Sequence, residues 1–217
     1  MQITKENLTI IIVTIKSQNI IDQCLKSIDP DVKKIIVENS TDQSFIDSLK
    51  EKYKNIECYI TGSNLGMGAG NNFGIIRSKT RYVMILNPDT ILKKDTLSQI
   101  FEASKNLEFA ILSPLSDNKD YPNYKILKDF KNNKNSLFEV DQIDGYAMVL
   151  DKNQFNENFF DEKIFMYLEN DDLCLRSKKN NKKIYIYSKS LISHLGAKAV
   201  DKKYSDQLEF SRNWHWN

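Results

Sequence analysis

The fold of this chain is indicated most clearly by the stretch Arg81-Tyr82-Val83-Met84-Ile85-Leu86-Asn87-Pro88-Asp89-Thr90. Its apolar run is not interrupted by alternating polar residues, which is typical of a strand covered on both faces in a parallel sheet between helices. Pro88 has no N–H and cannot extend the strand pairing. Asn87 and Asp89 should therefore lie at the carboxyl edge of the sheet, where open α/β sheets bind ligands.

The oxygen atoms of Asn87 and Asp89 suggest a cation site. Mg²⁺ and Mn²⁺ prefer oxygen ligands, and a cation held there would also bind the oxygens of a diphosphate. The alternative is an ordinary turn, because Asn-Pro-Asp favours turns in many contexts.

Length and composition narrow the class of protein. A chain of 217 residues is long enough for one domain with a substantial core. The net charge of +2 gives no global basic field, so we expect no nucleic-acid partner. The longest apolar run, Leu8 to Ile15, is far shorter than the roughly 20 residues of a membrane helix, and no secretion signal precedes it. We therefore expect a cytoplasmic protein. Its three cysteines, Cys24, Cys58 and Cys174, form no disulfide or zinc pattern.

Strand-like and helix-like segments alternate through the first 115 residues. Strands are expected at 9–14, 34–38, 57–60, 81–86 and 109–113, and helices at 21–28, 45–53, 67–78 and 97–104. This alternation predicts a parallel, right-handed α/β sheet.

The pattern changes after residue 115. A polar stretch, 117–135, is expected to be a long surface loop. Strands are expected at 138–143, 146–150, 183–187 and 191–194, and helices at 168–179 and 204–216. Because no Pro/Gly/Ser-rich linker separates the two parts, we expect a single domain over 1–217.

Glu38 and Asn39 end the second expected strand and should share the edge with Asp89. A carboxylate at that edge can accept hydrogen bonds from a ribose or a base. The alternative is a helix cap, because residues 39–42 are all good capping residues.

The segment from Asn64 to Gly74 holds four of the seven glycines. Glycines allow close backbone approach, and the amides at a helix N-terminus attract phosphate. A dinucleotide-binding fingerprint is the rival interpretation, but the glycine spacing does not match it. A third interpretation needs no ligand: the glycines let a helix pack tightly on the sheet.

Three carboxylates crowd into the segment from Tyr167 to Arg176. On a helix, Glu169, Asp172 and Arg176 share one face, so an ion pair between Asp172 and Arg176 is one explanation. That pair leaves Glu169 unexplained, and a carboxylate in a cleft could act as a general base.

The two histidines, His194 and His215, differ in context. His194 ends an expected strand and is a candidate metal ligand, although a lone histidine is more often structural. His215, between two tryptophans, is more consistent with packing.

Together these segments resemble the family 2 glycosyltransferases of the GT-A fold, in particular the rhamnosyltransferase-like branch. The matching segments, in order, are Val37 to Ser40, Asn64 to Asn72, Leu86 to Asp89, Asp144-Gly145, Phe160 to Glu162, Glu169 to Leu173, and His194. The resemblance covers nearly the whole chain. It implies a mostly parallel central sheet flanked by helices, with a Rossmann-like nucleotide-sugar-binding half at 1–115. A smaller, mixed acceptor-binding half would occupy 116–217, and its end inside an expected helix is compatible with a longer parent chain.

The resemblance implies roles for individual residues. Donor-binding residues would be Thr14, Glu38, Asn39, Asn64, Gly66, Asn71, Asn87 and Asp89; acceptor-binding residues would be Asp144, Gly145 and Tyr167; Asp89 and His194 would hold Mn²⁺ or Mg²⁺. The family's catalytic aspartate is replaced by Asn170, which cannot accept a proton. The base role would then pass to Glu169 or to Asp172.

The implied activity is inverting transfer of a sugar, with rhamnose as one candidate, from a nucleotide-diphosphate donor to a hydroxyl of a glycan or lipid-linked acceptor. Such an enzyme would serve cell-surface polysaccharide synthesis, and a lipid-linked acceptor would bring it to the inner face of the membrane. Two alternatives remain open: a catalytically silent nucleotide- or glycan-binding module, favoured by the asparagines at positions 87 and 170, and a nicotinamide-dependent oxidoreductase.

Overall fold

The computed structural model describes residues 2–119, 122–126, 136–156 and 159–196. The expected helix at 204–216, with His215, lies outside these residues. Within them, no helix has both the length and the apolar character needed to cross a membrane.

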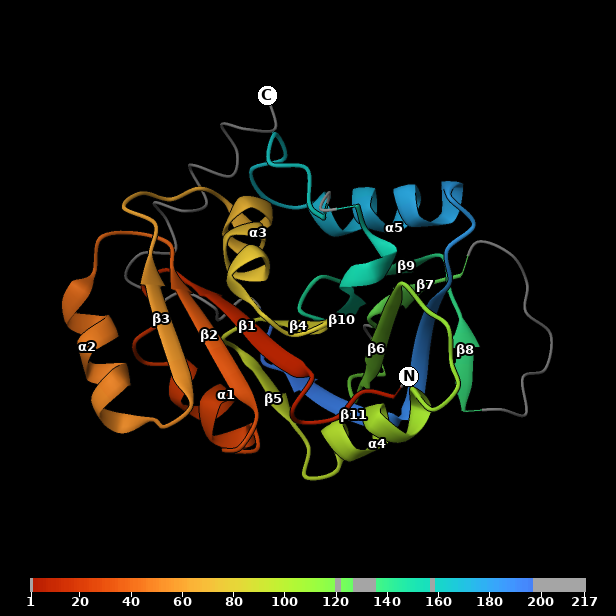
Figure 1. The fold of residues 1–217 in the computed structure, drawn as a ribbon, viewed down its shortest axis with the longest axis horizontal. Coiled ribbons are helices and arrows are strands. Elements are labelled where there is room, and N and C mark those ends of the chain that lie inside the picture. The colour runs from red at the N-terminus through yellow and green to blue at the C-terminus, as the bar shows by residue number, and fades with distance from the viewer. Residues whose placement is uncertain (1, 120–121, 127–135, 157–158, 197–217) are drawn as a thin grey trace.

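The first half of the chain forms a parallel sheet, as its alternating pattern predicts (Figure 1). The strands β1 (Leu8–Thr14), β2 (Lys33–Glu38), β3 (Ile56–Ile60) and β4 (Tyr82–Leu86) lie in the order β3-β2-β1-β4. The helices between them are α1 (Ile21–Ser27), α2 (Gln43–Lys52) and α3 (Met67–Arg77). All neighbouring pairs are parallel, so the carboxyl ends of the four strands meet at one edge.

The chain from residue 90 onward continues the same sheet in mixed orientation. Strand β10 (Ala147–Asp151) lies antiparallel between β4 and β6 (Ile111–Ser116). Strand β11 (Ile184–His194) pairs parallel with β6 and antiparallel with β5 (Thr90–Leu92) and β8 (Leu137–Glu139). This part of the chain also contains three helices: α4 (Thr96–Ala103), α5 (Glu169–Lys179) and the short 3-10 helix η1 (Lys152–Gln154). The result is one nine-stranded, mostly parallel sheet, and the predicted fold class is confirmed.

Several boundaries differ from those expected. The expected strand at 138–143 is two strands, β8 in the main sheet and β9 (Gln142–Ile143) in a separate ribbon with β7 (Tyr124–Lys125). The described part of the expected loop at 117–135 therefore contains a short strand. The two strands expected near the end are one, β11, whose pairing with β6 shifts register between Tyr187 and Leu191.

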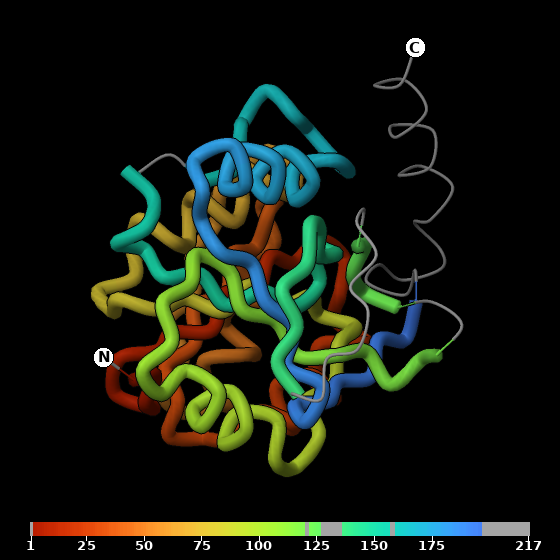
Figure 2. Tube along the Cα trace, turned by 90° about the vertical axis from the view of Figure 1, so that its right-hand side faces the viewer, coloured from red at the N-terminus to blue at the C-terminus, as the bar shows by residue number. Residues whose placement is uncertain are grey.

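Helices cover both faces of the sheet, which explains the uninterrupted apolar strands. Helices α1, α2 and α4 pack on one face, and α3 and α5 on the other. Figure 2 shows the blue α5 and the yellow-green α4 on opposite sides of the sheet. On α3, a Cβ at Gly74 would lie 2.6 Å from Ile11 Cγ2. Gly74 thus fits the interpretation that needs no ligand, since it lets the helix approach the sheet closely.

Candidate active site

The loop after β4 is fixed at the carboxyl edge of the sheet. The Asn87 N–H donates to the Tyr146 carbonyl (3.0 Å), the Thr90 N–H donates to the Asn87 carbonyl (3.0 Å), and the Leu195 N–H donates to the Asp89 carbonyl (3.0 Å). The Cys24 thiol lies beneath the loop and donates to the Asn87 carbonyl at 3.6 Å. These bonds hold Asp89 in a buried position, with its side chain 1% exposed.

Strand β11 brings His194 to this loop, because His194 is the register partner of Thr90 in β5. Its Nε2 lies 3.3 Å from Asp89 Oδ1. The imidazole stacks on the Tyr146 ring, with centroids 4.0 Å apart and planes 9° from parallel. Two residues more than a hundred positions apart in the sequence therefore share one site.

The Asp89 and His194 side chains fit a divalent cation. Ligands at right angles around Mg²⁺, each about 2.1 Å from the ion, lie about 3 Å apart, close to the separation observed. No third His, Cys, Asp or Glu in the described parts of the chain completes a protein-only metal cluster with them. Mg²⁺ commonly binds through one or two protein ligands and fills its other positions with water and substrate phosphates.

The ends of β1 and β2 place a second carboxylate on the same edge. The Thr14 hydroxyl donates to Glu38 Oε2 at 2.7 Å, and the Ser40 hydroxyl donates to Glu38 Oε1. The Glu38 side chain is fully buried. Burial raises its pKa, and the two hydroxyl bonds oppose that rise.

Asn39 connects this strand end to the glycine-rich segment. Its Nδ2 donates to Asn64 Oδ1 and to the Gly66 carbonyl, both at 3.1 Å, and its Oδ1 accepts from the Leu65 N–H at 3.0 Å. The cap of α2 is Asp42, which accepts from the Phe45 N–H. Asn39 therefore organises the loop before α3 and does not cap a helix.

Gly66 meets the second half of the chain directly. Its φ is +85°, and a Cβ there would lie 2.0 Å from the Phe165 carbonyl oxygen. The Met67 N–H donates to the same carbonyl at 3.0 Å. Only glycine fits this position without displacing the segment that leads to α5.

Two adjacent asparagines on α3 behave differently. Asn71 Oδ1 is buried and has no hydrogen-bond partner among the described residues. Asn72 donates to the Phe160 carbonyl (2.8 Å) and accepts from the Phe160 N–H (3.0 Å), which ties α3 to the second half. The family resemblance gives Asn71 a donor-binding role and gives Asn72 none. The signal that could have pointed to Asn72 is a pair of asparagines in a helix whose other residues are mostly apolar.

Helix α5 begins at the same edge, after an unusual turn. Tyr167 and Leu168 both have left-handed backbone angles, with φ of 62° and 67°, and both side chains are exposed. Glu169 follows and is buried, and its Oε2 has no hydrogen-bond partner in the described parts of the chain. Burial raises the pKa of Glu169; a hydrogen bond from its own backbone amide opposes the rise, and repulsion from Asp171 adds to it. A Cβ at Gly68 would lie 3.5 Å from Glu169 Cβ, so the starts of α3 and α5 are close together.

The Asp144-Gly145 segment packs against the start of α5. The Asn170 Nδ2 donates to the Ile143 carbonyl at 3.0 Å, and a Cβ at Gly145 would lie 3.3 Å from Asn170 Cβ. Burial and repulsion from Asp171 raise the pKa of Asp144, while Lys125 and His194 oppose the rise. Asp144 is thus electrostatically coupled to both α5 and the metal-binding candidate His194.

Asp172 has a partner of its own. Arg176 Nε donates to Asp172 Oδ2 at 2.7 Å, and the same guanidinium donates to the Phe159 carbonyl. This is the ion pair that the helical spacing suggests. Of the two base candidates, Glu169 is therefore the one with a buried oxygen that has no hydrogen-bond partner among the described residues.

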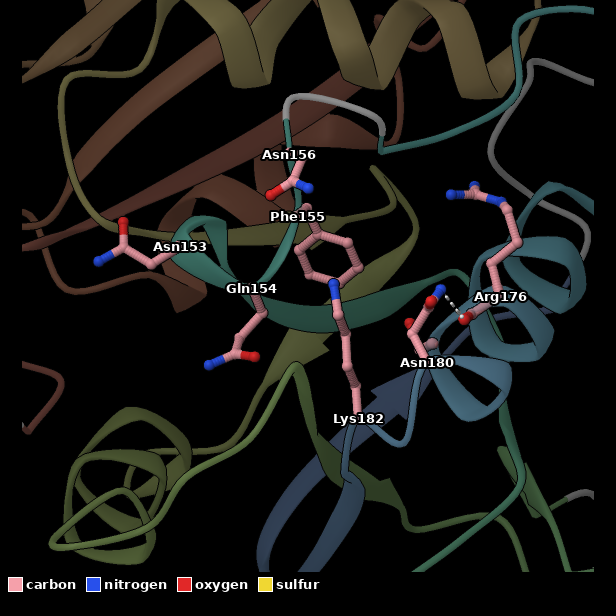
Figure 3. A pocket seen from close by; sticks show the side chains of 8 residues that line it. Asn153, Gln154, Phe155, Asn156, Arg176, Asn180 and Lys182 are labelled. Atoms are coloured by element: carbon pink, nitrogen blue, oxygen red, sulfur yellow. Dashed lines mark hydrogen bonds between the residues drawn. The ribbon is translucent and has the colours of Figure 1, made fainter.

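A cavity of about 540 Å³ lies away from this edge (Figure 3). It is lined by Asn153, Gln154, Phe155, Asn156, Arg176, Ser177, Asn180 and Lys182. Strand β10 ends just before it at Asp151, whose register partner Tyr82 starts β4, so the cavity lies toward the opposite edge of the sheet. In Figure 3 the Lys182 chain points toward the Phe155 ring, and the ammonium is 5.0 Å from the ring centroid. None of the residues with expected site roles lines this cavity.

Comparison with known proteins identifies the family. Residues 9–170 match the model of the family described as Glycosyl transferase family 2. The chain belongs to glycosyl transferase family 2. It is 31% identical over 199 residues to the rhamnosyltransferase WbbL of Escherichia coli K12, covering 77% of this chain and 75% of WbbL. It is 24% identical over 197 residues to the low-salt glycan biosynthesis hexosyltransferase Agl10 of Haloferax volcanii, covering 81% of this chain and 63% of Agl10.

Solved structures share the GT-A fold of this family 2 chain. S. aureus TarS 1-349 matches with a TM-score of 0.64 at 13% identity, over 87% of this chain and 60% of that one. GalNAc-T7, solved with UDP, GalNAc and Mn²⁺, matches with a TM-score of 0.70 at 10% identity, over 87% of this chain and 43% of that one. The family 2 chain thus spans about three fifths of the TarS structure and less than half of GalNAc-T7.

Proposed function

We propose that this protein is a metal-dependent, inverting glycosyltransferase that moves a sugar from a nucleoside-diphosphate donor to an acceptor hydroxyl. The observation that carries the proposal is the 3.3 Å approach of His194 Nε2 to Asp89 Oδ1 at the edge that also bears Glu38. Family membership supports the reaction class, and GalNAc-T7, which shares the fold, was crystallised with UDP and Mn²⁺.

The donor would bind over the ends of β1, β2 and β4. Thr14, Glu38 and Asn39 would contact the nucleoside, and the amides around Asn64, Gly66 and Asn71 would face the rest of the donor. Asn87 would lie beside the diphosphate, and Asp89 and His194 would hold Mn²⁺ or Mg²⁺ there. Such a cation neutralises the charge that develops on the departing diphosphate.

The acceptor would bind from the second half of the chain. Glu169 is the proposed base, because its Oε2 lacks a partner among the described residues and burial raises its pKa, which makes it a stronger base than an ordinary carboxylate. The acceptor oxygen would then attack the anomeric carbon opposite the leaving group. Asp144, Gly145 and Tyr167 would line the acceptor side, and Asp172 is the weaker base candidate because it already pairs with Arg176.

The names of the relatives suggest the biological setting. A hexosyltransferase of glycan biosynthesis and a rhamnosyltransferase support a hexose or rhamnose donor and a role in cell-surface polysaccharide synthesis. The acceptor would be a glycan or a lipid-linked sugar, reached from the cytoplasmic side of the membrane.

A thermal-shift panel tests the donor and metal sites together. Nucleoside diphosphates with Mn²⁺ should raise the melting temperature, because both bind only the folded state, whereas either alone should have little effect. Asp89→Ala should abolish the combined shift. The matched control is Asp95→Ala, an exposed carboxylate outside the site, which should keep it. An undiminished shift in Asp89→Ala would contradict the proposed metal site.

A catalytically silent binding module is the second candidate, favoured by Asn170 at the family's catalytic aspartate. It predicts the same thermal shifts without chemistry. Incubation of the wild-type protein with nucleotide-sugars, Mn²⁺ and candidate glycan acceptors separates the two, since only an enzyme releases nucleoside diphosphate.

A further inference from the structure

We infer that Tyr146 is a positioning residue that aligns His194 with Asp89. The expected effect on cation binding rests on the proposed function. The orientation of the His194 imidazole does not depend on it. The structural observation is that one residue contacts both sides of the pair, through its backbone on the Asp89 side and through its ring on the His194 side.

The backbone of Tyr146 supports the Asp89 loop. Its carbonyl accepts from the Asn87 N–H at 3.0 Å and from the Thr90 hydroxyl at 3.4 Å. These two donors lie on either side of Asp89 in the sequence. The start of β10 therefore fixes the loop from which the carboxylate projects.

The ring of Tyr146 supports His194. The two rings are nearly parallel, 9° apart, at a centroid distance of 4.0 Å. The His194 side chain is 23% exposed, so without this contact solvent would leave it room for other rotamers. The tyrosine ring is itself held in place, because it is buried in the core cluster on that face of the sheet. Stacking thus leaves the imidazole with its Nε2 edge toward Asp89.

Loss of the ring should loosen His194 and weaken cation binding. Partners that orient a metal ligand from behind typically contribute about 10-fold or more to metal affinity. Tyr146→Leu and Tyr146→Met both remove the flat ring and keep an apolar side chain, while Tyr146→Phe retains the ring. The matched control is Tyr82→Leu. Tyr82 is also a buried tyrosine in a stacked ring pair, with Phe109 at 5.9 Å between centroids, and it starts β4 at the end away from Asp89.

Two measurements on the full chain test the inference. In His215→Gln protein, the remaining imidazole is read by NMR without metal; its ring protons should be shifted upfield by the tyrosine ring in wild type and Tyr146→Phe, and not in Tyr146→Leu or Tyr146→Met. Titration with Mn²⁺ in the presence of UDP, followed by EPR, should show about 10-fold weaker binding in the two ring-less variants and wild-type affinity in Tyr82→Leu.

The outcomes separate this inference from the proposed function. An unchanged imidazole spectrum in the ring-less variants would overturn the positioning role, as would loss of the ring shift with unaltered Mn²⁺ affinity. If wild-type protein binds no Mn²⁺ in the presence of UDP, the metal assignment fails, and the NMR comparison alone decides whether Tyr146 orients His194.

Discussion

Asp89 and Glu169 are two buried carboxylates with different surroundings. Asp89 faces an imidazole, whereas Glu169 Oε2 has no hydrogen-bond partner in the described parts of the chain and its neighbour Asp171 is also acidic. Two carboxylates in contrasting environments can take different roles in one reaction. The environments here suit Asp89 to a cation and Glu169 to a proton.

Glu169→Gln should lower kcat by about 10²–10⁴, because the amide cannot accept the acceptor's proton. Steady-state transfer assays measure this once a donor and an acceptor are found. The matched control is Asp172→Asn on the same face of α5, which should stay within a few-fold of wild type. A larger loss in Asp172→Asn would reverse the assignment of the base.

The same residue predicts a pH dependence of stability. Burial raises the pKa of Glu169, so between its usual value of 4.5 and the raised value the folded protein binds more protons than the unfolded chain. The free energy of unfolding contributed by this group is therefore complete below pH 4.5 and decreases as the pH rises through that window. Relative to wild type, Glu169→Gln should gain stability from pH 4 to pH 7 in urea unfolding; Glu51→Gln, on an exposed face of α2, should show no such trend.

At the scale of single residues, the sequence shows which polar residues follow the end of a strand. It does not show which residues become neighbours across the sheet. Asp89 and His194 could be expected in one site from the resemblance to family 2, whereas the end of a strand alone does not fix the edge in a mixed sheet, as the antiparallel β10 shows. Tyr146 looks like an ordinary strand residue, since nothing local shows that its ring reaches β11. Asn72 likewise depends on a partner, Phe160, that lies 88 positions away.

Among the elements, the start of α5 carries backbone strain at the site. Two consecutive non-glycine residues with positive φ cost about 1–2 kcal/mol each. Strain of this kind is often retained where it places a functional side chain, and the side chain that follows this turn is Glu169, the proposed base.

Leu168→Gly should therefore raise the free energy of unfolding by about 1 kcal/mol and lower activity, because glycine removes the strain and loosens the turn. Urea unfolding and transfer assays measure the two effects. Asn106→Gly, at a positive-φ residue after α4, is the control and should leave activity unchanged. A Leu168→Gly variant with full activity would show that the turn does not position Glu169.

The elements that the sequence could predict are those with their own periodicity. Helices α1 to α4 and strands β1 to β4 each show a local pattern, and their bounds agree with the expected ranges to within a few residues. The two-residue strands β7 and β9 have no such pattern, because they exist only through pairing with each other. The division of residues 138–143 between two sheets is decided by those partners.

In the whole molecule, β10 joins the two halves by pairing with β4 on one side and β6 on the other. Arg81 strengthens the pairing of β4 with β10, since its guanidinium donates two hydrogen bonds, of 2.9 and 2.6 Å, to the Asp151 carboxylate. The order of strands could not be predicted from the sequence, because β10 lies between β4 and β6, two strands that precede it in the sequence.

This shared sheet predicts that the two halves of the chain unfold together. Urea denaturation followed by far-UV circular dichroism should give one transition, and calorimetric and van't Hoff enthalpies should agree. Asp151→Ala should lower the midpoint and keep the single transition. Two separate transitions in the wild-type protein would show that the halves are independent.

The rate at which the Cys24 thiol is alkylated can report on motion of the loop above it. Its thiol is buried under the Asn87 carbonyl, and burial raises its pKa well above the ordinary range. Alkylating reagents attack the thiolate, so they can modify Cys24 only when the floor of the loop opens to water. The half-buried Cys58 on β3 provides an internal reference, and the ratio of the two labelling rates measures how often the loop that carries Asp89 lifts from the sheet.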